Sequence, residues 1–322
     1  LELTEMDNGV LEKLLKEEEV IFARVSPEHK MRIVTAFKDM NEVVAVTGDG
    51  VNDAPALKKA DIGVAMGIRG SDVAKEAAAM ILTDDNFASI VAAIEEGRAV
   101  FSNIKKFVTY IFASNIPEIV PFIAFVLFKI PLPLTVMQIL AVDLGTDMVP
   151  ALALGAEPPE PGIMDKPPRP RNKRLLDLPL LLRAYCFLGP MEAVACMAGF
   201  FFIYFQHGWR PGMAMPDSGH IYLTATTMSL AGIIATQIGN VFACKTEKES
   251  LFKVGFLSNR LVLLGIASEL MIISVLIYTP FFQRIFGLAP IGLKDWGFLF
   301  AFTPFLFLME EARKWIVRRW WR

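Results

Sequence analysis

Two groups of side chains in this sequence have the residue types and spacing to bind metal ions. The first group, Asp49, Asn52 and Asp53, lies in the turn Gly48–Asp53. Two carboxylates four residues apart, with an amide between them, suit Mg²⁺, which binds one or two carboxylates together with phosphate oxygens. The glycines let the backbone turn sharply and approach an anion. For the glycine-aspartate pattern alone, an ordinary Asx-rich turn is the alternative interpretation.

The second group consists of three carboxylates inside apolar segments, Glu118, Asp143 and Asp147. Each carboxylate at the centre of a membrane helix costs about 2.5–3.5 kcal/mol, and no Lys or Arg lies in the middle of either segment to pair with it. Asn115 lies three residues before Glu118, and Asp143 lies four before Asp147, so each pair shares a helix face. The missing positive charge is most simply a transported cation. Protonated carboxyl groups hydrogen-bonded between helices are the alternative.

Prolines beside these carboxylates add oxygen ligands. Pro117 and Pro121 have no N–H, so the carbonyls of Ala113 and Pro117 lose their usual helical partners. Pro150 does the same for Thr146. Transporters build cation sites from broken helices with free carbonyls near the membrane midplane, and hard cations bind such oxygens.

The elements that must position the first group form an α/β pattern. Short apolar, β-rich runs at 42–47, 62–66 and 79–82 alternate with helical patterns such as Ala54–Lys59. This alternation predicts a parallel sheet, and such sheets bind ligands at the carboxyl ends of their strands. The turn that carries Asp49 begins at such an end.

The second group requires a membrane. Hydrophobic residues make up 54% of the 322 residues and the mean hydropathy is +0.45, which excludes a purely soluble enzyme and a disordered chain. The net charge of −2 also argues against a nucleic-acid partner and leaves membrane lipid as the expected surroundings. Apolar stretches of about 20 residues predict an all-α bundle of six transmembrane helices. They lie at about 107–128, 134–154, 179–205, 221–244, 261–282 and 295–317.

Lysines and arginines indicate the orientation of this bundle. They concentrate in the loops 155–178 and 245–260 and in the C-terminal tail, whereas the opposite loops hold few. Cytoplasmic loops carry such an excess of positive charge. We therefore expect an integral, multi-pass membrane protein with its N-terminal part and its C-terminal tail in the cytoplasm.

Four motifs carry a resemblance to a known family. Thr47–Leu57 reads TGDGVNDAPAL and Phe22–Lys30 reads FARVSPEHK, and both are followed by DIGVAMG and LTDDNFASIVAAIEEGR. The chain resembles the C-terminal portion of class II P-type cation-transporting ATPases, the family of the sodium pump and the sarcoplasmic reticulum calcium pump. The resemblance implies that residues 1–100 are part of a Rossmann-like phosphorylation domain of the haloacid dehalogenase type. Residues 101–322 would then form the transmembrane domain.

The resemblance also assigns roles in the first group. It implies that Asp49, with Asp53, binds Mg²⁺, and that Asn52 and Asp53 hold the phosphorylation site together. Lys30 would contact the phosphoryl group. Two further residues of the same motif belong to the implied catalytic set, Thr47 and Gly48.

In the membrane, the resemblance implies a set of ligands for the transported cation: Asn115, Glu118, Asp143, Thr146, Asp147, Gln237 and Asn240. Tyr110 and Glu269 match further residues around that site. For Gln237, Asn240 and Glu269, plain hydrogen bonding between helices is the alternative.

The expected function is that of the C-terminal part of an ATP-driven pump. It would move a Na⁺/K⁺-type cation or Ca²⁺ through an aspartyl-phosphate cycle with Mg²⁺ as cofactor and ATP as substrate. The family's Asp-Lys-Thr-Gly phosphorylation motif does not occur in this sequence, and neither do its nucleotide-binding and actuator domains. We therefore expect a fragment that is inactive without the N-terminal part of the same pump.

Two other functions are alternatives. A membrane-tethered phosphatase of the dehalogenase group needs its own nucleophilic Asp pair near the N-terminus, and the sequence shows none. A non-catalytic membrane fragment, such as a channel or scaffold, explains the apolar segments but not the TGDGVNDAPAL motif.

Overall fold

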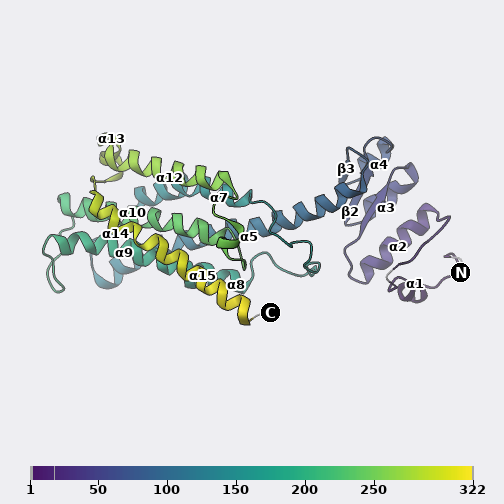
Figure 1. Cartoon of the computed structure of the whole chain (residues 1–322), viewed down its shortest axis with the longest axis horizontal. Coiled ribbons are helices and arrows are strands. Elements are labelled where there is room, and N and C mark those ends of the chain that lie inside the picture. The colour runs from purple at the N-terminus through teal and green to yellow at the C-terminus, as the bar shows by residue number, and fades with distance from the viewer. Residues whose placement is uncertain (1–2, 18, 321–322) are drawn as a thin grey trace. The chain divides into compact units, whose positions relative to one another are not determined.

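The computed structural model describes residues 3–17 and 19–320 and divides into two compact units (Figure 1). The first unit consists of the residues up to Glu96 together with Lys166–Lys173. The second consists of Gly97–Asp165 and the chain from Arg174 onward. Each unit has its own buried apolar clusters, so each is described by itself.

The first unit is built on a three-stranded parallel sheet in the order β1-β2-β3. Its strands are β1 (Ala45–Gly48), β2 (Ile62–Met66) and β3 (Met80–Leu82). Its helices are α1 (Asn8–Leu14), α2 (Pro27–Asp39), the 3₁₀ turn η1 (Val51–Asp53), α3 (Ala54–Lys59) and α4 (Asp72–Ala77). The predicted alternation of strands and helices and the parallel sheet are confirmed. Because all three strands run the same way, their carboxyl ends meet at one edge.

The turn after β1 depends on a glycine. A Cβ atom built at Gly48 would lie 2.5 Å from the Cβ of Asp53, closer than real side chains approach. Only glycine therefore lets the chain fold Asp53 back against the end of β1. Pro55 in the first turn of α3 then starts the next helix, where a missing N–H costs nothing.

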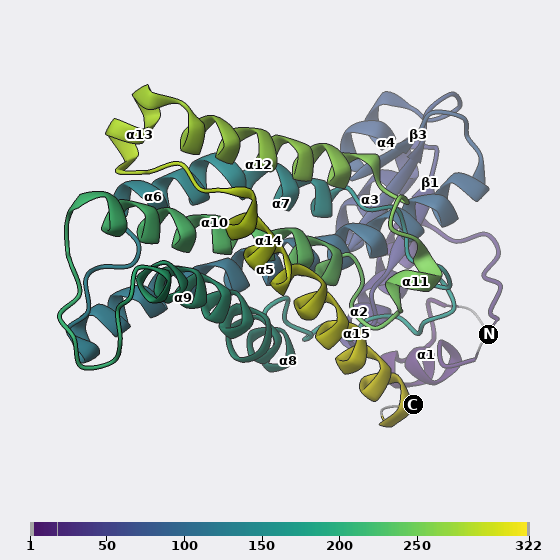
Figure 2. The ribbon, with the colours of Figure 1, turned by 60° about the vertical axis from the view of Figure 1, so that its left-hand side comes forward.

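The second unit is helical. Its helices, beginning with one that starts before Gly97, are α5 (Phe87–Phe128), α6 (Val136–Ala141), the π-helical segment η2 (Val142–Thr146), α7 (Met148–Gly155), α8 (Leu178–Leu181), the π-helical segment η3 (Leu182–Leu188), α9 (Gly189–Gln206), α10 (Gly219–Cys244), α11 (Leu251–Val254), α12 (Arg260–Tyr278), α13 (Pro280–Phe286), α14 (Leu293–Phe300) and α15 (Phe302–Trp320). Helix α10 is the central one, with 78% of its most apolar stretch buried. Helices α9 and α15 pack against it, and α12 lies alongside α7 (Figures 1 and 2).

Five helical stretches among the described residues are long and apolar enough to cross a membrane: Phe87–Phe128, Val136–Gly155, Leu178–Gln206, Gly219–Cys244 and Arg260–Tyr278. They correspond to the first five predicted segments. The predicted count of six is not confirmed, because the sixth segment, 295–317, is divided between α14 and α15 and is not among the five. Its hydropathy is lowered by charged residues such as Glu310 and Lys314.

These charged residues are paired inside the unit. Glu310 is fully buried and forms an ion pair of 2.7 Å with Arg183 of η3. Lys314 is also fully buried, and its Nζ lies 3.1 Å from Glu311 and donates to Thr246 Oγ1 at 2.9 Å. Polar pairing therefore fixes α15 against the segments that follow α8 and α10.

Candidate functional site

The carboxyl edge of the sheet holds a pocket of about 320 Å³ in the first unit. Five of the six residues to which the resemblance assigned phosphoryl chemistry line it: Lys30, Thr47, Gly48, Asp49 and Asp53. Asn52, the sixth, is exposed in η1 and does not line the pocket. The edge of the sheet thus brings together most of the predicted set.

Asp53 is the best-anchored carboxylate of this pocket. Its Oδ1 forms an ion pair with Lys30, and its Oδ2 accepts from the backbone N–H groups of Gly50 at 3.1 Å and Asp49 at 3.3 Å. Partial burial raises the pKa of Asp53. The hydrogen bonds from Lys30 and Gly50 outweigh this effect and hold the pKa below its usual range. Asp53 is therefore a charged group that fixes both Lys30 and the turn.

Asp49 is placed differently. It is exposed at the end of β1, and its backbone is held on both sides, because its carbonyl accepts from Ser71 N–H at 2.8 Å and its N–H donates to Asp53. Its own carboxylate makes no hydrogen bond or ion pair with another described residue.

This arrangement fits Mg²⁺ through Asp49 rather than through Asp53, whose two oxygens are already engaged. Among the described residues, no group of three or more His, Cys, Asp or Glu side chains is arranged to hold a metal ion. A site with a single free carboxylate suits Mg²⁺, because this ion keeps several waters and takes phosphate oxygens as its other ligands.

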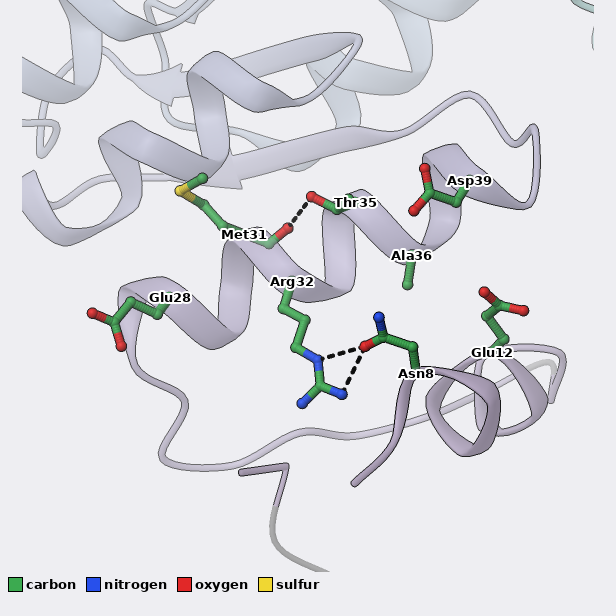
Figure 3. A pocket seen from close by; sticks show the side chains of 8 residues that line it. All are labelled: Asn8, Glu12, Glu28, Met31, Arg32, Thr35, Ala36 and Asp39. Carbon is green, nitrogen blue, oxygen red and sulfur yellow. Dashed lines mark hydrogen bonds between the residues drawn. The ribbon is translucent and has the colours of Figure 1, made fainter. Parts of the chain in front are cut away.

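A second pocket of about 350 Å³ lies between α1 and α2 and contains none of the predicted site residues. Figure 3 shows Arg32 reaching from α2 toward Asn8 at the start of α1. Its Nε and one terminal nitrogen donate to Asn8 Oδ1 at 3.1 and 2.8 Å, and its other terminal nitrogen donates to the Leu3 carbonyl at 2.7 Å. Because the Arg32 guanidinium is hydrogen-bonded in joining the two helices, it is not available to bind an anionic ligand in this pocket.

The membrane carboxylates gather between α5 and the segment that runs from α6 to α7. Glu118 is 9% exposed and Asp147 is 3% exposed, and the charged groups nearest Glu118 are Asp143 and Asp147. Tyr110 donates its hydroxyl proton to Asp147 Oδ1 over 3.4 Å. Asp143 itself is exposed, and Asn115 is half-buried. The predicted first and second helices therefore bring their carboxylates together.

Helices α9, α10 and α12 add further polar side chains. Gln237 of α10 is fully buried and donates from Nε2 to Ser114 Oγ at 3.4 Å. Asn240, one turn further along α10, is also fully buried, and its Oδ1 accepts from Cys244 Sγ at 3.3 Å. These contacts are hydrogen bonds between and within helices, and they leave both residues available for either of the two predicted roles.

Two carboxylates on neighbouring helices are more deeply buried than those in the predicted ligand set. Glu192 of α9 and Glu269 of α12 are fully buried. No described donor meets strict hydrogen-bond geometry with either carboxylate, but the side chain of Asn240 is close enough to act on Glu192. Asp147 lies within electrostatic range of both. The sequence had placed Glu192 outside the ligand set.

The backbone near Asp147 is irregular. In η2 the N–H of Asp147 bonds the Val142 carbonyl, five residues back, at 3.0 Å, and the hydroxyl of Thr146 bonds the same carbonyl at 3.2 Å. A π-helical turn of this kind is frequent at functional sites. Pro150 follows in α7, so irregular backbone flanks Asp147 on both sides.

Helix α5 contains Pro117 and Pro121 but continues unbroken past them. The carbonyl of Ala113, which has lost its usual partner to Pro117, faces Gly189 at the start of α9, where a Cβ atom would lie 2.9 Å from it. Glycine therefore allows α9 to approach the proline-disrupted part of α5.

Comparison with known proteins identifies the family. Residues 131–316 match the family described as cation transporting ATPase, C-terminus, and residues 32–94 match haloacid dehalogenase-like hydrolase. The first match covers more than half of the chain. The chain belongs to the cation-transporting ATPases.

Individual relatives of this ATPase chain are sodium/potassium-transporting ATPase subunits. It is 41% identical to subunit alpha-4 of Rattus norvegicus over 344 residues, which cover 99% of this chain and 33% of the relative. It is 40% identical to subunit alpha-2 of Bos taurus, over 99% of this chain and 34% of that relative. It is 41% identical to subunit alpha of Drosophila melanogaster, over 99% of this chain and 33% of that relative. The chain spans about a third of the length of the curated relatives it matches.

In this ATPase chain, the pocket at the carboxyl edge of the sheet, called the phosphoryl pocket below, is also lined by two charged residues that the sequence did not predict, Arg69 and Asp85. Both follow the carboxyl ends of strands, Arg69 after β2 and Asp85 after β3. The rule that pointed to Asp49 after β1 therefore also points to these two residues.

Proposed function

We propose that this chain is the C-terminal part of an ATP-driven pump that moves a cation of the Na⁺/K⁺ type, or Ca²⁺, across a membrane through an aspartyl-phosphate cycle. Residues 1–100 would belong to the cytoplasmic phosphorylation domain and residues 101–322 to the transmembrane domain. The observation that carries the proposal is that Asp143 and Asp147 act electrostatically on Glu118, on helices long and apolar enough to span a membrane. Among the described residues these carboxylates alone are not arranged to hold a metal ion, so amide, hydroxyl and carbonyl oxygens would complete the site.

A cation is the simplest compensation for this cluster. The charged groups that act on Glu118 and Asp147 among the described residues are carboxylates, and no Lys or Arg acts on either. Each membrane carboxylate costs about 2.5–3.5 kcal/mol, and several placed together also repel one another. A bound cation offsets both costs, and the carbonyl, amide and carboxylate oxygens around it are the ligands that hard cations prefer.

The exposure of Asp143 supports a longer protein. At mid-membrane a carboxylate faces protein or a water-filled cavity, not lipid. We propose that helices from the missing N-terminal part of the pump cover Asp143 and supply further oxygens. The same missing part would contain the actuator domain, the nucleotide-binding domain and the aspartate that is phosphorylated.

In the phosphoryl pocket, this chain's residues would position the reacting groups. Asp53 holds Lys30 by an ion pair, and Lys30 would contact the transferring phosphoryl group. Asp49 would hold Mg²⁺, which when bound neutralises the charge that develops on phosphoryl oxygens. Thr47 and Gly48 shape the end of β1, and Asn52 would hold the site together from η1.

The distribution of positive charge supports an orientation. The loops at 155–178 and 245–260 and the C-terminal tail are rich in lysine and arginine, and the tail's Arg313, Lys314, Arg318 and Arg319 lie in the last part of α15. We therefore place these segments and the N-terminal unit in the cytoplasm. Tail and N-terminal unit share one side only if the chain crosses the membrane an even number of times. We therefore propose that α14 and α15 together make the sixth crossing, with Arg183 compensating Glu310.

The test is phosphoenzyme formation in the full-length protein. Asp49→Asn should lower the acid-stable phosphoenzyme formed from ATP and Mg²⁺ by at least about tenfold, because the variant loses the negative charge that holds Mg²⁺. Asp39→Asn makes the same charge change at an exposed position of α2 outside this pocket and serves as the control. A normal phosphoenzyme level in Asp49→Asn would contradict the proposed site.

A further inference from the structure

The segment that follows β2 is held in a fixed position at the phosphoryl pocket. The N–H of Gly67 bonds the Leu82 carbonyl at 2.8 Å. The N–H groups of Ile68 and Arg69 donate to the two carboxylate oxygens of Asp85 at 2.9 and 2.8 Å. The backbone hydrogen bond from Ile68, ahead of the one from Arg69, lowers the pKa of Asp85, so this carboxylate stays charged at neutral pH.

The other end of the segment is tied to the proposed Mg²⁺ ligand. Ser71 donates its N–H to the Asp49 carbonyl at 2.8 Å, and its hydroxyl caps α4 by accepting from Ala74 N–H at 3.2 Å. Arg69 lies between these two anchors, so its Cα has little freedom to move relative to Asp49. A rigid backbone lowers the entropy lost when its side chain binds a ligand.

Among the described residues that line the pocket, Arg69 is a cation without an ion-pair partner. Of the two cationic residues that line it, Lys30 is paired with Asp53. Arg69 is exposed, and its guanidinium makes no hydrogen bond or ion pair with another described residue. Asp85 is near enough to feel its charge but is occupied by backbone N–H groups.

We propose that Arg69 is an additional binding residue for the phosphate oxyanion at this site. The inference rests on the proposed function and extends it to a residue that neither the motif nor the resemblance assigned. A dianionic phosphate beside Asp49 and its Mg²⁺ has more oxygens than the metal and Lys30 can serve. The planar guanidinium offers paired N–H donors that match two oxygens of a phosphate.

The proposal is tested with orthovanadate, a vanadium oxyanion with the tetrahedral shape and a charge similar to that of phosphate. In the full-length protein, Arg69→Gln should raise the orthovanadate concentration that half-inhibits Mg²⁺-dependent ATP hydrolysis by about tenfold, as expected for one charge-assisted contact. Arg69→Lys keeps the charge but loses the paired donors, so its shift should be smaller but measurable.

Lys58→Gln is the matched control. Lys58 is an exposed cation of α3 in the same unit and does not line the pocket, and its replacement by Gln removes the same charge as Arg69→Gln. The orthovanadate concentration that half-inhibits the Lys58→Gln variant should stay within about twofold of the value for the unmodified protein. Because Asp85 holds the backbone of Arg69 and not its side chain, Arg69→Gln and Arg69→Lys both leave the anchoring hydrogen bonds in place.

Three outcomes overturn the inference. The first is an Arg69→Gln variant with unchanged orthovanadate sensitivity. The second is a Lys58→Gln variant with an equal shift, which would mean that general surface charge is responsible. The third is a change in the rate at saturating ATP without any change in orthovanadate sensitivity, which would mean that Arg69 contacts protein instead of the anion. If any of these occurs while Asp49→Asn still lowers the phosphoenzyme level as predicted, the proposed function stands and only the role of Arg69 is removed.

Discussion

Replacing Asp147 by Asn removes the most enclosed carboxylate of the predicted ligand set without changing its size. Asp147 is 3% exposed, follows the π-helical segment η2, and has Glu118 and Asp143 as neighbours. Its position beside both predicted ligand helices lets it reach a cation shared with Glu118. We therefore expect Asp147→Asn to weaken binding of the transported cation more than any other single substitution in the set.

The size of the effect follows from the contact that is lost. A hydrogen bond or contact to a charged group contributes about 1.5–3 kcal/mol, which corresponds to a loss of affinity of about 10- to 150-fold. The hydroxyl of Tyr110 reaches Asp147 over 3.4 Å, a long hydrogen bond, so Tyr110→Phe should lower the affinity by only about two- to fivefold. Glu192→Gln should stay within about twofold, because it preserves the size of the side chain and its Oε1 can still accept from the neighbouring Asn240 amide.

The assay is cation-dependent phosphorylation of the full-length protein, with the cation concentration for half-maximal phosphoenzyme as the readout and the ATP affinity as an internal check. Asp165→Asn, which makes the same charge change at an exposed position after α7, is the matched control. An unchanged cation titration for Asp147→Asn would refute the reasoning. A larger shift for Glu192→Gln than for Asp147→Asn would also refute it and would move the centre of the site toward α9.

Two further predictions concern charge pairs. Lys30→Met should move the acid limb of the pH profile of phosphoenzyme formation to higher pH. Without Lys30, partial burial raises the pKa of Asp53, so this carboxylate is protonated at a higher pH as the solution is acidified. Lys38→Met, which loses an ion pair with Asp61, is the control and should leave the acid limb in place. Glu310→Gln should lower the free energy of unfolding in detergent by about 3 kcal/mol, because it leaves Arg183 buried without its carboxylate. Glu249→Gln, in an exposed pair with Lys253, should cost less than about 1 kcal/mol, and equal losses for the two variants would contradict the prediction.

The sheet was predictable because its signals are local. The apolar runs that end near Thr47, Met66 and Leu82 each precede a polar turn, and strands with that pattern pair in parallel when helices connect them. The sixth predicted segment, 295–317, has a weaker signal, and the predicted count of six is not confirmed. Hydropathy alone cannot register that Glu310 is compensated by Arg183, which lies more than a hundred residues earlier in the chain.

The phosphoryl pocket was partly predictable. Asp49 and Asp53 could be found from their spacing. Which of the two forms an ion pair and which keeps a free carboxylate could not, because that depends on the position of Lys30 on α2. The sequence also gave no reason to separate Asn52 from the pocket lining, since that depends on the direction of the 3₁₀ turn. Arg69 could have been found by applying the strand-end rule to β2 as well as to β1.

Backbone irregularity and carboxylate chemistry coincide in the membrane unit for a physical reason. In hydrocarbon every backbone polar group needs a partner, so a π-helical turn or a proline inside a helix persists only where protein or a polar cavity serves the freed groups. Carboxylates at that depth have the same requirement, because they too need a polar partner. The η2 segment, Asp143, Asp147 and Pro150 all fall within the nine residues from Val142 to Pro150, which run from η2 into α7. In the proposed pump, a single bound cation would satisfy freed carbonyls and carboxylates together, and both costly features would then stabilise one site.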